Sequence, residues 1–238
     1  MSVAAIATAV FHTARVSVPT IFEGLAGRID IEVCNRRLAS WARALVRQAQ
    51  IRIEVVGAEH AEPGESFVVM SNHRSLYDIP VLFEALGRPL RMVAKKELFK
   101  IPLMGGAMHA SGFVEVDRGN RARAVASLAA ARVRLQQGIS IWIAPEGTRS
   151  ETGELGPFKR GGFHLALGTG TRILPVTLVG TENVLVPRGW RVQRGATVKA
   201  TLSAPIDPKD FGQARRAELM QAVREAIERH LGSSGLTA

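Results

Sequence analysis

The chain has 238 residues, 46% of them apolar, so it suits one globular domain with a substantial core, and a disordered chain is not expected. The formal net charge is +10, and only six of the 31 basic residues are Lys. An Arg-rich surface favours phosphate-bearing partners, which include nucleic acid, anionic lipid headgroups and phosphorylated small molecules.

Cys34 is the single cysteine, which excludes an intrachain disulfide and a CxxC zinc site. The six histidines lack metal-ligand spacing, so we expect no metal.

The first residues of the chain are apolar but interrupted. Residues 1–26 contain charged positions and Pro19, and no run of 18 apolar residues free of charge occurs in the sequence. A membrane-spanning helix is therefore not expected. The start also lacks the basic region of a secretory signal, so export is not expected either.

Residues 35–50 predict an amphipathic helix, with apolar residues at i, i+3, i+4, i+7 spacing and Arg residues on the other side. A basic helix with a Trp in its apolar stripe lies either in an anionic membrane surface or against the core of its own domain, and this segment alone favours neither. We predict that residues 1–49 form a helical, interfacial segment. The stripe contains Leu38, Trp41, Ala42, Leu45 and Ala49, and the basic side contains Arg36, Arg43 and Arg47, with Arg37 on its flank.

From residue 50 to residue 238, strand and helix patterns alternate. This alternation predicts an α/β fold in which a mixed, largely parallel central sheet is flanked by helices. We expect strands at 51–55, 66–71, 90–94, 113–116, 139–144, 174–179 and 198–202, and helices at 79–86, 120–137 and 214–231.

Three polar, glycine-punctuated loops follow apolar strands, at residues 71–78, 117–121 and 145–161. In open α/β sheets, ligands bind at the carboxyl ends of the strands. Loops that leave the same edge of the sheet converge, so we expect these three to line a single crevice.

The first loop carries an imidazole and a carboxylate, His73 and Asp78, five positions apart. On one continuous helix they would be separated by about 140° and could not meet. They can meet if His73 lies in the loop and Asp78 in the first turn of the following helix, an arrangement that suits a general base oriented by an acid. The alternative is structural, because Ser75-x-x-Asp78 also resembles a helix capping box.

The other loops carry groups that suit an anion. Asp117 and Arg118 end a short apolar strand that follows Gly112. Residues 144–150 read Ala-Pro-Glu-Gly-Thr-Arg-Ser, in which Gly147 allows close backbone approach and Arg149 offers a forked phosphate contact, although the spacing is not that of a nucleotide P-loop. Each stretch alone is also typical of a plain polar turn.

Four segments in this order resemble the 1-acylglycerol-3-phosphate O-acyltransferase family, which also includes glycerol-3-phosphate and lyso-lipid acyltransferases. They are Asn72-His73 with Asp78, Gly112 with Asp117-Arg118, Ala144-Pro145-Glu146-Gly147-Thr148-Arg149-Ser150, and Ile173-Leu174-Pro175-Val176. Also similar is the segment from Lys95 to Pro102. The resemblance covers about residues 50–210, with two departures: Ala144 replaces an aromatic residue and Glu115 an apolar one.

The resemblance implies an enzyme that transfers an acyl chain from acyl-CoA or acyl carrier protein to the hydroxyl of a lyso-lipid, with no cofactor beyond this co-substrate. It implies 1-acyl-sn-glycerol-3-phosphate as acceptor and a peripheral or monotopic place at the cytoplasmic face of an anionic membrane. His73 and Asp78 would be catalytic. The acceptor would be bound by Arg118, Glu146, Gly147, Thr148, Arg149 and Lys95.

Other functions remain open at this point. The acceptor could be another lyso-lipid, such as a lyso-ornithine lipid. The charge would also suit a nucleic-acid-binding protein, but aromatic residues are sparse and no nucleic-acid-binding motif is present, so we expect no nucleic-acid partner. A serine hydrolase using Ser71 or Ser75 beside His73 would need a G-x-S-x-G elbow, which the sequence lacks.

Overall fold

The computed structural model describes residues 3–117, 121–186, 189 and 191–232. Seven strands form one sheet in the order β1-β7-β6-β2-β5-β3-β4. Strands β6, β2, β5, β3 and β4 are mutually parallel, whereas β7 is antiparallel to β6 and parallel to β1. The mixed, largely parallel sheet expected from the sequence is therefore confirmed. The strands are β1 (Arg52–Val56), β2 (Val68–Ser71), β3 (Leu90–Lys95), β4 (Val114–Val116), β5 (Ser140–Ile143), β6 (Ile173–Val179) and β7 (Thr197–Leu202).

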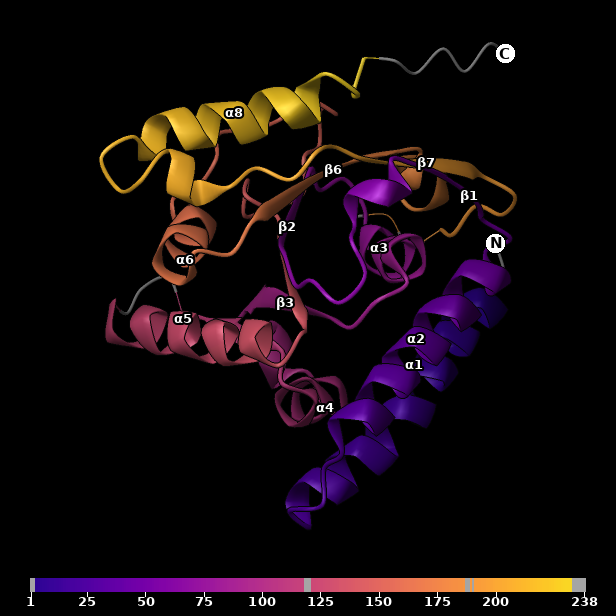
Figure 1. The fold of residues 1–238 in the computed structure, drawn as a ribbon. Coiled ribbons are helices and arrows are strands. Elements are labelled where there is room, and N and C mark those ends of the chain that lie inside the picture. The colour runs from indigo at the N-terminus through magenta and orange to yellow at the C-terminus, as the bar shows by residue number, and fades with distance from the viewer. Residues whose placement is uncertain (1–2, 118–120, 187–188, 190, 233–238) are drawn as a thin grey trace.

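Helices cover both faces of the sheet (Figure 1). Helices α5, α6 and α8 lie on one side, and α2 and α3 lie on the other, next to α1 and α4. The helices are α1 (Val3–Leu25), α2 (Ile31–Gln48), α3 (Asp78–Leu86), α4 (Met104–Ser111), α5 (Arg121–Gln136), α6 (Gly161–Thr169), α7 (Thr181–Val184) and α8 (Arg216–Glu228). Helices α4 and α6 and the short α7 were not expected from the sequence.

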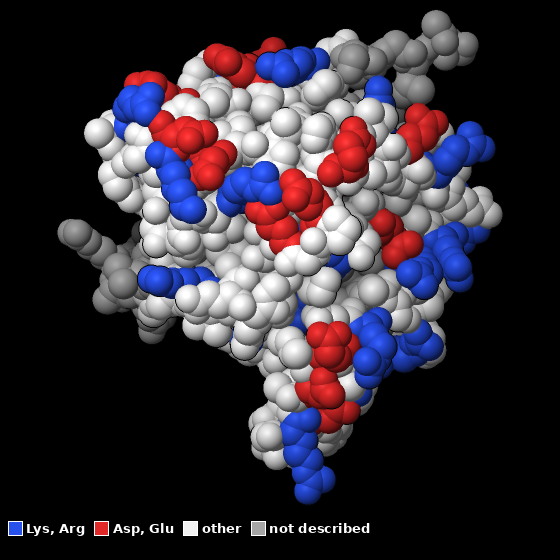
Figure 2. All heavy atoms as spheres, viewed as in Figure 1, with Lys and Arg blue, Asp and Glu red and all other residues white. Residues whose placement is uncertain are grey.

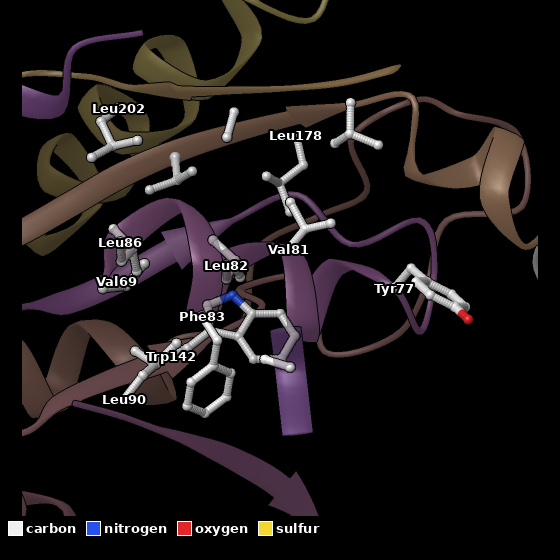
Figure 3. Packing of buried hydrophobic residues seen from close by; sticks show 14 of the residues in the cluster. Val69, Tyr77, Val81, Leu82, Phe83, Leu86, Leu90, Trp142, Leu178 and Leu202 are labelled. Atoms are coloured by element: carbon white, nitrogen blue, oxygen red, sulfur yellow. The ribbon is translucent and has the colours of Figure 1, made fainter. Parts of the chain in front are cut away.

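The alternation of side chains along β2 separates two apolar cores. Val69 faces a cluster shared with α3, β6 and β7, whereas Val68 and Met70 face a cluster shared with α5, α6 and α8. Figure 3 shows part of the first cluster, in which Leu178 from β6 points toward Val81 from α3. Because β2 is buried on both faces at the centre of the sheet, the segment that leaves it is held by rigid neighbours.

The N-terminal helices pack on the domain. Asp30 caps α2 by accepting hydrogen bonds from the backbone N–H groups of Glu32 and Val33. Ala42 and Ala49 of the predicted stripe are completely buried in the first core cluster. The apolar face of α2 therefore lies against the domain and not in a membrane, and the boundary at residue 50 divides chain segments that share one core.

Arg91 of β3 ties this layer together. Its guanidinium is completely buried and donates to Asn35 Oδ1 of α2 and to the carbonyl of Ser111 at the end of α4. Burial lowers the pKa of Arg91 to about 10. One side chain thus links the sheet to two helices.

Helix α1 leaves apolar side chains in solvent. Phe11, Phe22 and Leu25 are 61%, 69% and 82% exposed, and Val10 is similarly exposed. Of the helices in the described part of the chain, none is long and apolar enough to cross a membrane. Figure 2 shows basic side chains, with acidic ones among them, along the hairpin of α1 and α2, at the lower right. Arg15, Arg36, Arg43 and Arg47 line one groove of this hairpin.

Candidate active site

The exit of β2 is fixed by Asn72. Its side-chain amide donates to the carbonyl of Leu178 (2.8 Å) and accepts from the N–H of the same residue (2.8 Å). The amide takes the place of a peptide group and continues the pairing of β2 with β6 beyond Ser71. The backbone can then leave the sheet at the next residue, His73, without losing a hydrogen-bond partner.

His73 and Asp78 meet at the start of α3. Nδ1 of His73 lies 2.6 Å from Oδ2 of Asp78, whose side chain is completely buried. The same oxygen accepts hydrogen bonds from the N–H groups of Arg74 (2.8 Å) and Ser75 (2.9 Å). The carboxylate therefore has both of the roles that the sequence left open: it holds the loop before the helix and it orients the imidazole.

This contact decides which ring nitrogen can act as a base. A carboxylate accepts a hydrogen bond, so Nδ1 of His73 carries the proton and Nε2 carries the free electron pair. Among the described residues, Nε2 has no hydrogen-bond partner, and 15% of the side chain is exposed. The indole of Trp142 packs edge-on against the ring, with centroids 5.4 Å apart, and its Nε1 donates to Ser71 Oγ. The imidazole is thus held by Asp78 and Trp142, with Nε2 as its unprotonated nitrogen.

The loop after β5 is held against this pair by Glu146. Its Oε1 accepts from the N–H of His73 (3.0 Å) and its Oε2 from the N–H of Gly156 (2.9 Å). The N–H of Ser150 also donates to the carbonyl of His73 (2.7 Å). Burial raises the pKa of Glu146, against the opposing effect of hydrogen bonds from Gly156 and His73. Both carboxylate oxygens are used within the protein, so this geometry supports a bracing role for Glu146.

The other residues expected at the acceptor site lie at the same edge of the sheet or outside the described residues. Gly147 has a positive φ of 77° in the loop after β5, where Thr148 is exposed and Arg149 half-buried. Lys95 is exposed at the carboxyl end of β3. Arg118 lies outside the described residues. The loops after β2, β3 and β5 therefore share one edge.

An apolar pocket of about 100 Å³, which no sequence pattern indicated, lies among the N-terminal helices and α4. It is bounded by α1, α2 and α4, and by Ile79, which directly follows Asp78. Its lining comes from widely separated segments, so no local motif could reveal it. The lining includes Val16, Leu38, Trp41, Met104, Met108 and Phe113.

Comparison with known proteins gives consistent matches. A family model described as Acyltransferase matches residues 52–179. The chain is 30% identical over 190 residues to the 1-acyl-sn-glycerol-3-phosphate acyltransferase alpha of Mus musculus, covering 78% of this chain and 67% of that protein. It is 32% identical over 182 residues to the 1-acyl-sn-glycerol-3-phosphate acyltransferase of Salmonella typhimurium, covering 76% and 73%.

Other relatives are longer than this chain, which spans 52% of the human 1-acyl-sn-glycerol-3-phosphate acyltransferase alpha at 37% identity over 146 residues. Among solved structures, the 1-acyl-sn-glycerophosphate acyltransferase from Thermotoga maritima superposes with a TM-score of 0.74 and 27% identity. That match covers 89% of this chain and 85% of the solved one.

Proposed function

This chain belongs to the acyltransferase family, and on that premise we propose that it transfers an acyl chain from a thioester donor to the free hydroxyl of a lyso-phospholipid. The acceptor we propose is 1-acyl-sn-glycerol-3-phosphate, which the names of its relatives contain, and the product is then phosphatidic acid. The contact between His73 Nδ1 and Asp78 Oδ2 is the observation that carries the proposal.

The chemistry follows from the unprotonated Nε2 of His73. An alcohol is a weak nucleophile at neutral pH, so Nε2 of His73 takes the hydroxyl proton as the oxygen attacks the thioester carbonyl. Asp78 stabilises the imidazolium that forms. When the tetrahedral intermediate collapses, the C–O ester bond remains, the C–S bond breaks, and the imidazolium returns the proton to the leaving sulfur. No covalent acyl-enzyme is needed.

Cationic groups at the same edge of the sheet would bind the acceptor phosphate. Arg149 offers a forked contact and Lys95 offers a point charge. Gly147 and Thr148 offer a backbone and a hydroxyl group in the loop that Glu146 holds against the loop of His73. Arg118, which lies outside the described residues, is proposed as a further phosphate ligand from its place in the sequence motif alone. Holding the phosphate there would place the free hydroxyl near Nε2, which removes much of the entropic cost of reaction. The apolar pocket beside Ile79 would hold part of an acyl chain.

The substrates are amphiphiles, and the surface of α1 suits them. The exposed side chains of Phe11, Phe22 and Leu25 can enter the interface of a membrane, and the Arg residues of α2 can contact anionic headgroups. We therefore place the enzyme peripherally on the cytoplasmic face of a membrane, where acyl-CoA and acyl carrier protein are available.

One assay tests the function and the base together. Purified protein is incubated with acyl-CoA and a panel of lyso-lipids, among them lysophosphatidic acid and a lyso-ornithine lipid, and the products are identified by mass. We expect phosphatidic acid from the wild type and a loss of kcat of about 10²–10⁴-fold in His73→Ala.

The matched control is His109→Ala, because His109 is exposed and also faces a carboxylate, Glu115, at 3.5 Å. It should keep wild-type activity. Undiminished turnover in His73→Ala would refute the assignment of the base, and esterification of a different lyso-lipid alone would refute the assignment of the acceptor.

A further inference from the structure

A second pocket, of about 340 Å³, lies between the loop before α6 and the first turns of α8. Arg160 and Arg216 line it together with Phe158, Met220 and Arg224. Figure 1 shows α6 and α8 side by side at the upper left, away from the hairpin of α1 and α2. The pocket therefore lies apart from the surface proposed for membrane contact.

The pocket contains positive charge that the described residues leave unpaired. Neither Arg160 nor Arg216 forms an ion pair within the described part of the chain, whereas Arg224 is held by Glu228 at 2.8 Å. The pKa of nearby His164 is lowered, first by desolvation and then by the charges of Arg216 and Arg160. Two guanidinium groups thus act on the same volume, close to the first turns of α6 and α8, where the helix dipoles favour an anion. The acidic residue of that turn of α8, Glu218, is paired with Arg215 at 3.6 Å. A bound anion would relieve this repulsion.

The wall of the pocket is connected to the active site through three residues. Arg224 donates to the carbonyls of Gly156 (2.8 Å) and Leu155 (2.7 Å). The N–H of Gly156 donates to Glu146, whose other oxygen accepts from the N–H of His73. A ligand in the pocket would therefore lie against the loop that braces the catalytic histidine.

The lining is aromatic as well as cationic. Phe158 stacks on Phe163, with centroids 6.2 Å apart and an interplanar angle of 24°, and Arg224 lies over its ring. The guanidinium forks of Arg160 and Arg216 suit phosphate oxygens, and Phe158 and Met220 give the pocket apolar surface for a base. Their combination in a concave pocket fits a phosphorylated nucleotide better than the convex surface of an acidic carrier protein.

We propose that this pocket binds the phosphorylated nucleotide end of a coenzyme A donor and so directs its thioester toward His73. This rests on the proposed acyl transfer for the identity of the donor. The nucleotide takes no part in bond making, so its contacts with Arg160 and Arg216 contribute through binding and orientation of the remote reacting end.

The decisive measurement compares acyl-CoA with acyl-pantetheine, which has the same thioester but no nucleotide. In Arg160→Ala and Arg216→Ala, we expect kcat/KM for acyl-CoA to fall by about 10- to 100-fold, the range for a lost hydrogen bond to a charged group. The value for acyl-pantetheine should change by less than about 2-fold, because that donor never reaches the pocket. Arg229→Ala, an exposed Arg at the end of α8, is the charge-matched control and should follow the wild type with both donors.

A binding measurement separates this proposal from the proposed reaction. Titration calorimetry with adenosine 3′,5′-bisphosphate needs no turnover, and we expect binding to the wild type and to Arg229→Ala that is lost in Arg216→Ala. If no donor is used but this binding pattern holds, the nucleotide site stands and the acyl transfer fails. Three outcomes would each overturn the proposal. The variants could lose kcat/KM equally with acyl-CoA and acyl-pantetheine, they could lose it only with acyl carrier protein as donor, or the wild type could fail to bind the nucleotide.

Discussion

At the scale of single residues, Asp78 carries the sharpest expectation. An asparagine there keeps the shape of the side chain but removes the charge that faces the imidazolium, and its amide can hold the ring in the wrong tautomer. We expect Asp78→Asn to lower kcat by about 10²–10⁴-fold, measured in steady state with acyl-CoA. Circular dichroism checks that the fold persists. An unchanged kcat would show that Asp78 only caps the loop.

Glu146 gives a second expectation, because both of its oxygens accept from backbone N–H groups. In Glu146→Gln the amide nitrogen would face one of these donors, and one N–H would be left unsatisfied, at a cost of about 1–3 kcal/mol in unfolding free energy. We expect kcat to fall while the KM for the acceptor stays the same. A raised acceptor KM with unchanged kcat would instead support substrate binding by Glu146. Glu154→Gln, an exposed carboxylate in the same loop, is the control.

The same residue predicts a pH effect. Burial raises the pKa of Glu146 above its ordinary value of 4.5, so the folded state binds this proton more tightly than the unfolded state. Its contribution to stability is then fully present below pH 4.5 and is lost as pH rises through the raised pKa. The unfolding free energy of the wild type relative to Glu146→Gln should therefore decline over that window in denaturant titrations. If the unfolding free energy of the wild type relative to Glu146→Gln grew with pH instead, the prediction would be contradicted.

The sequence could indicate the chemical groups here but not all of their contacts. The spacing of His73 and Asp78 predicted a meeting of loop and first helical turn, and the structure places them so. Glu146 was expected to bind the acceptor because of its position in a motif. Its partners, His73 and Gly156, lie in separate loops, and only the folded arrangement of β2 beside β5 brings them together.

At the scale of elements, periodicity predicted which residues of α2 share a face but not what that face contacts, because a core and a membrane are both apolar. Helices α4 and α6 are not predicted by the sequence pattern because each begins near a Gly-Gly pair, which is typical of loops. Close packing explains why these two helices contain glycine. A Cβ at Gly105 would overlap the carbonyl of Phe99, and one at Gly162 would lie 3.0 Å from Met70.

The apolar pocket beside α4 yields an element-scale prediction. Ala107 lines it, and in Ala107→Leu the added methyl groups would occupy space proposed for the acyl chain. We expect kcat/KM to fall for long-chain acyl-CoA and to change little for short-chain donors, measured across a series of chain lengths. Ala130→Leu, on the exposed side of α5, is the matched control. Equal losses at all chain lengths would place the acyl chain elsewhere.

At the scale of the whole molecule, the net charge of +10 and the exposed apolar residues of α1 predict binding to anionic bilayers. We expect Phe22→Glu to weaken sedimentation with anionic vesicles by about 10-fold or more, because a large apolar side chain loses its burial in the interface. Val133→Glu changes an exposed apolar residue on α5 in the same way and should bind like the wild type. Wild-type binding should weaken as salt is raised. If Phe22→Glu and Val133→Glu weakened vesicle binding equally, α1 would have no special contact with the bilayer.

The two hydrogen bonds between the Asn72 side chain and the Leu178 backbone also have a consequence for synthesis of the protein. The amide that sets the direction of the catalytic loop is held by a residue 106 positions later in the chain. A nascent polypeptide that has left the ribosome only as far as β5 would therefore carry both members of the dyad without the strand that aligns them. The direction of this loop would therefore be fixed only late in translation, after the N-terminal hairpin has already emerged.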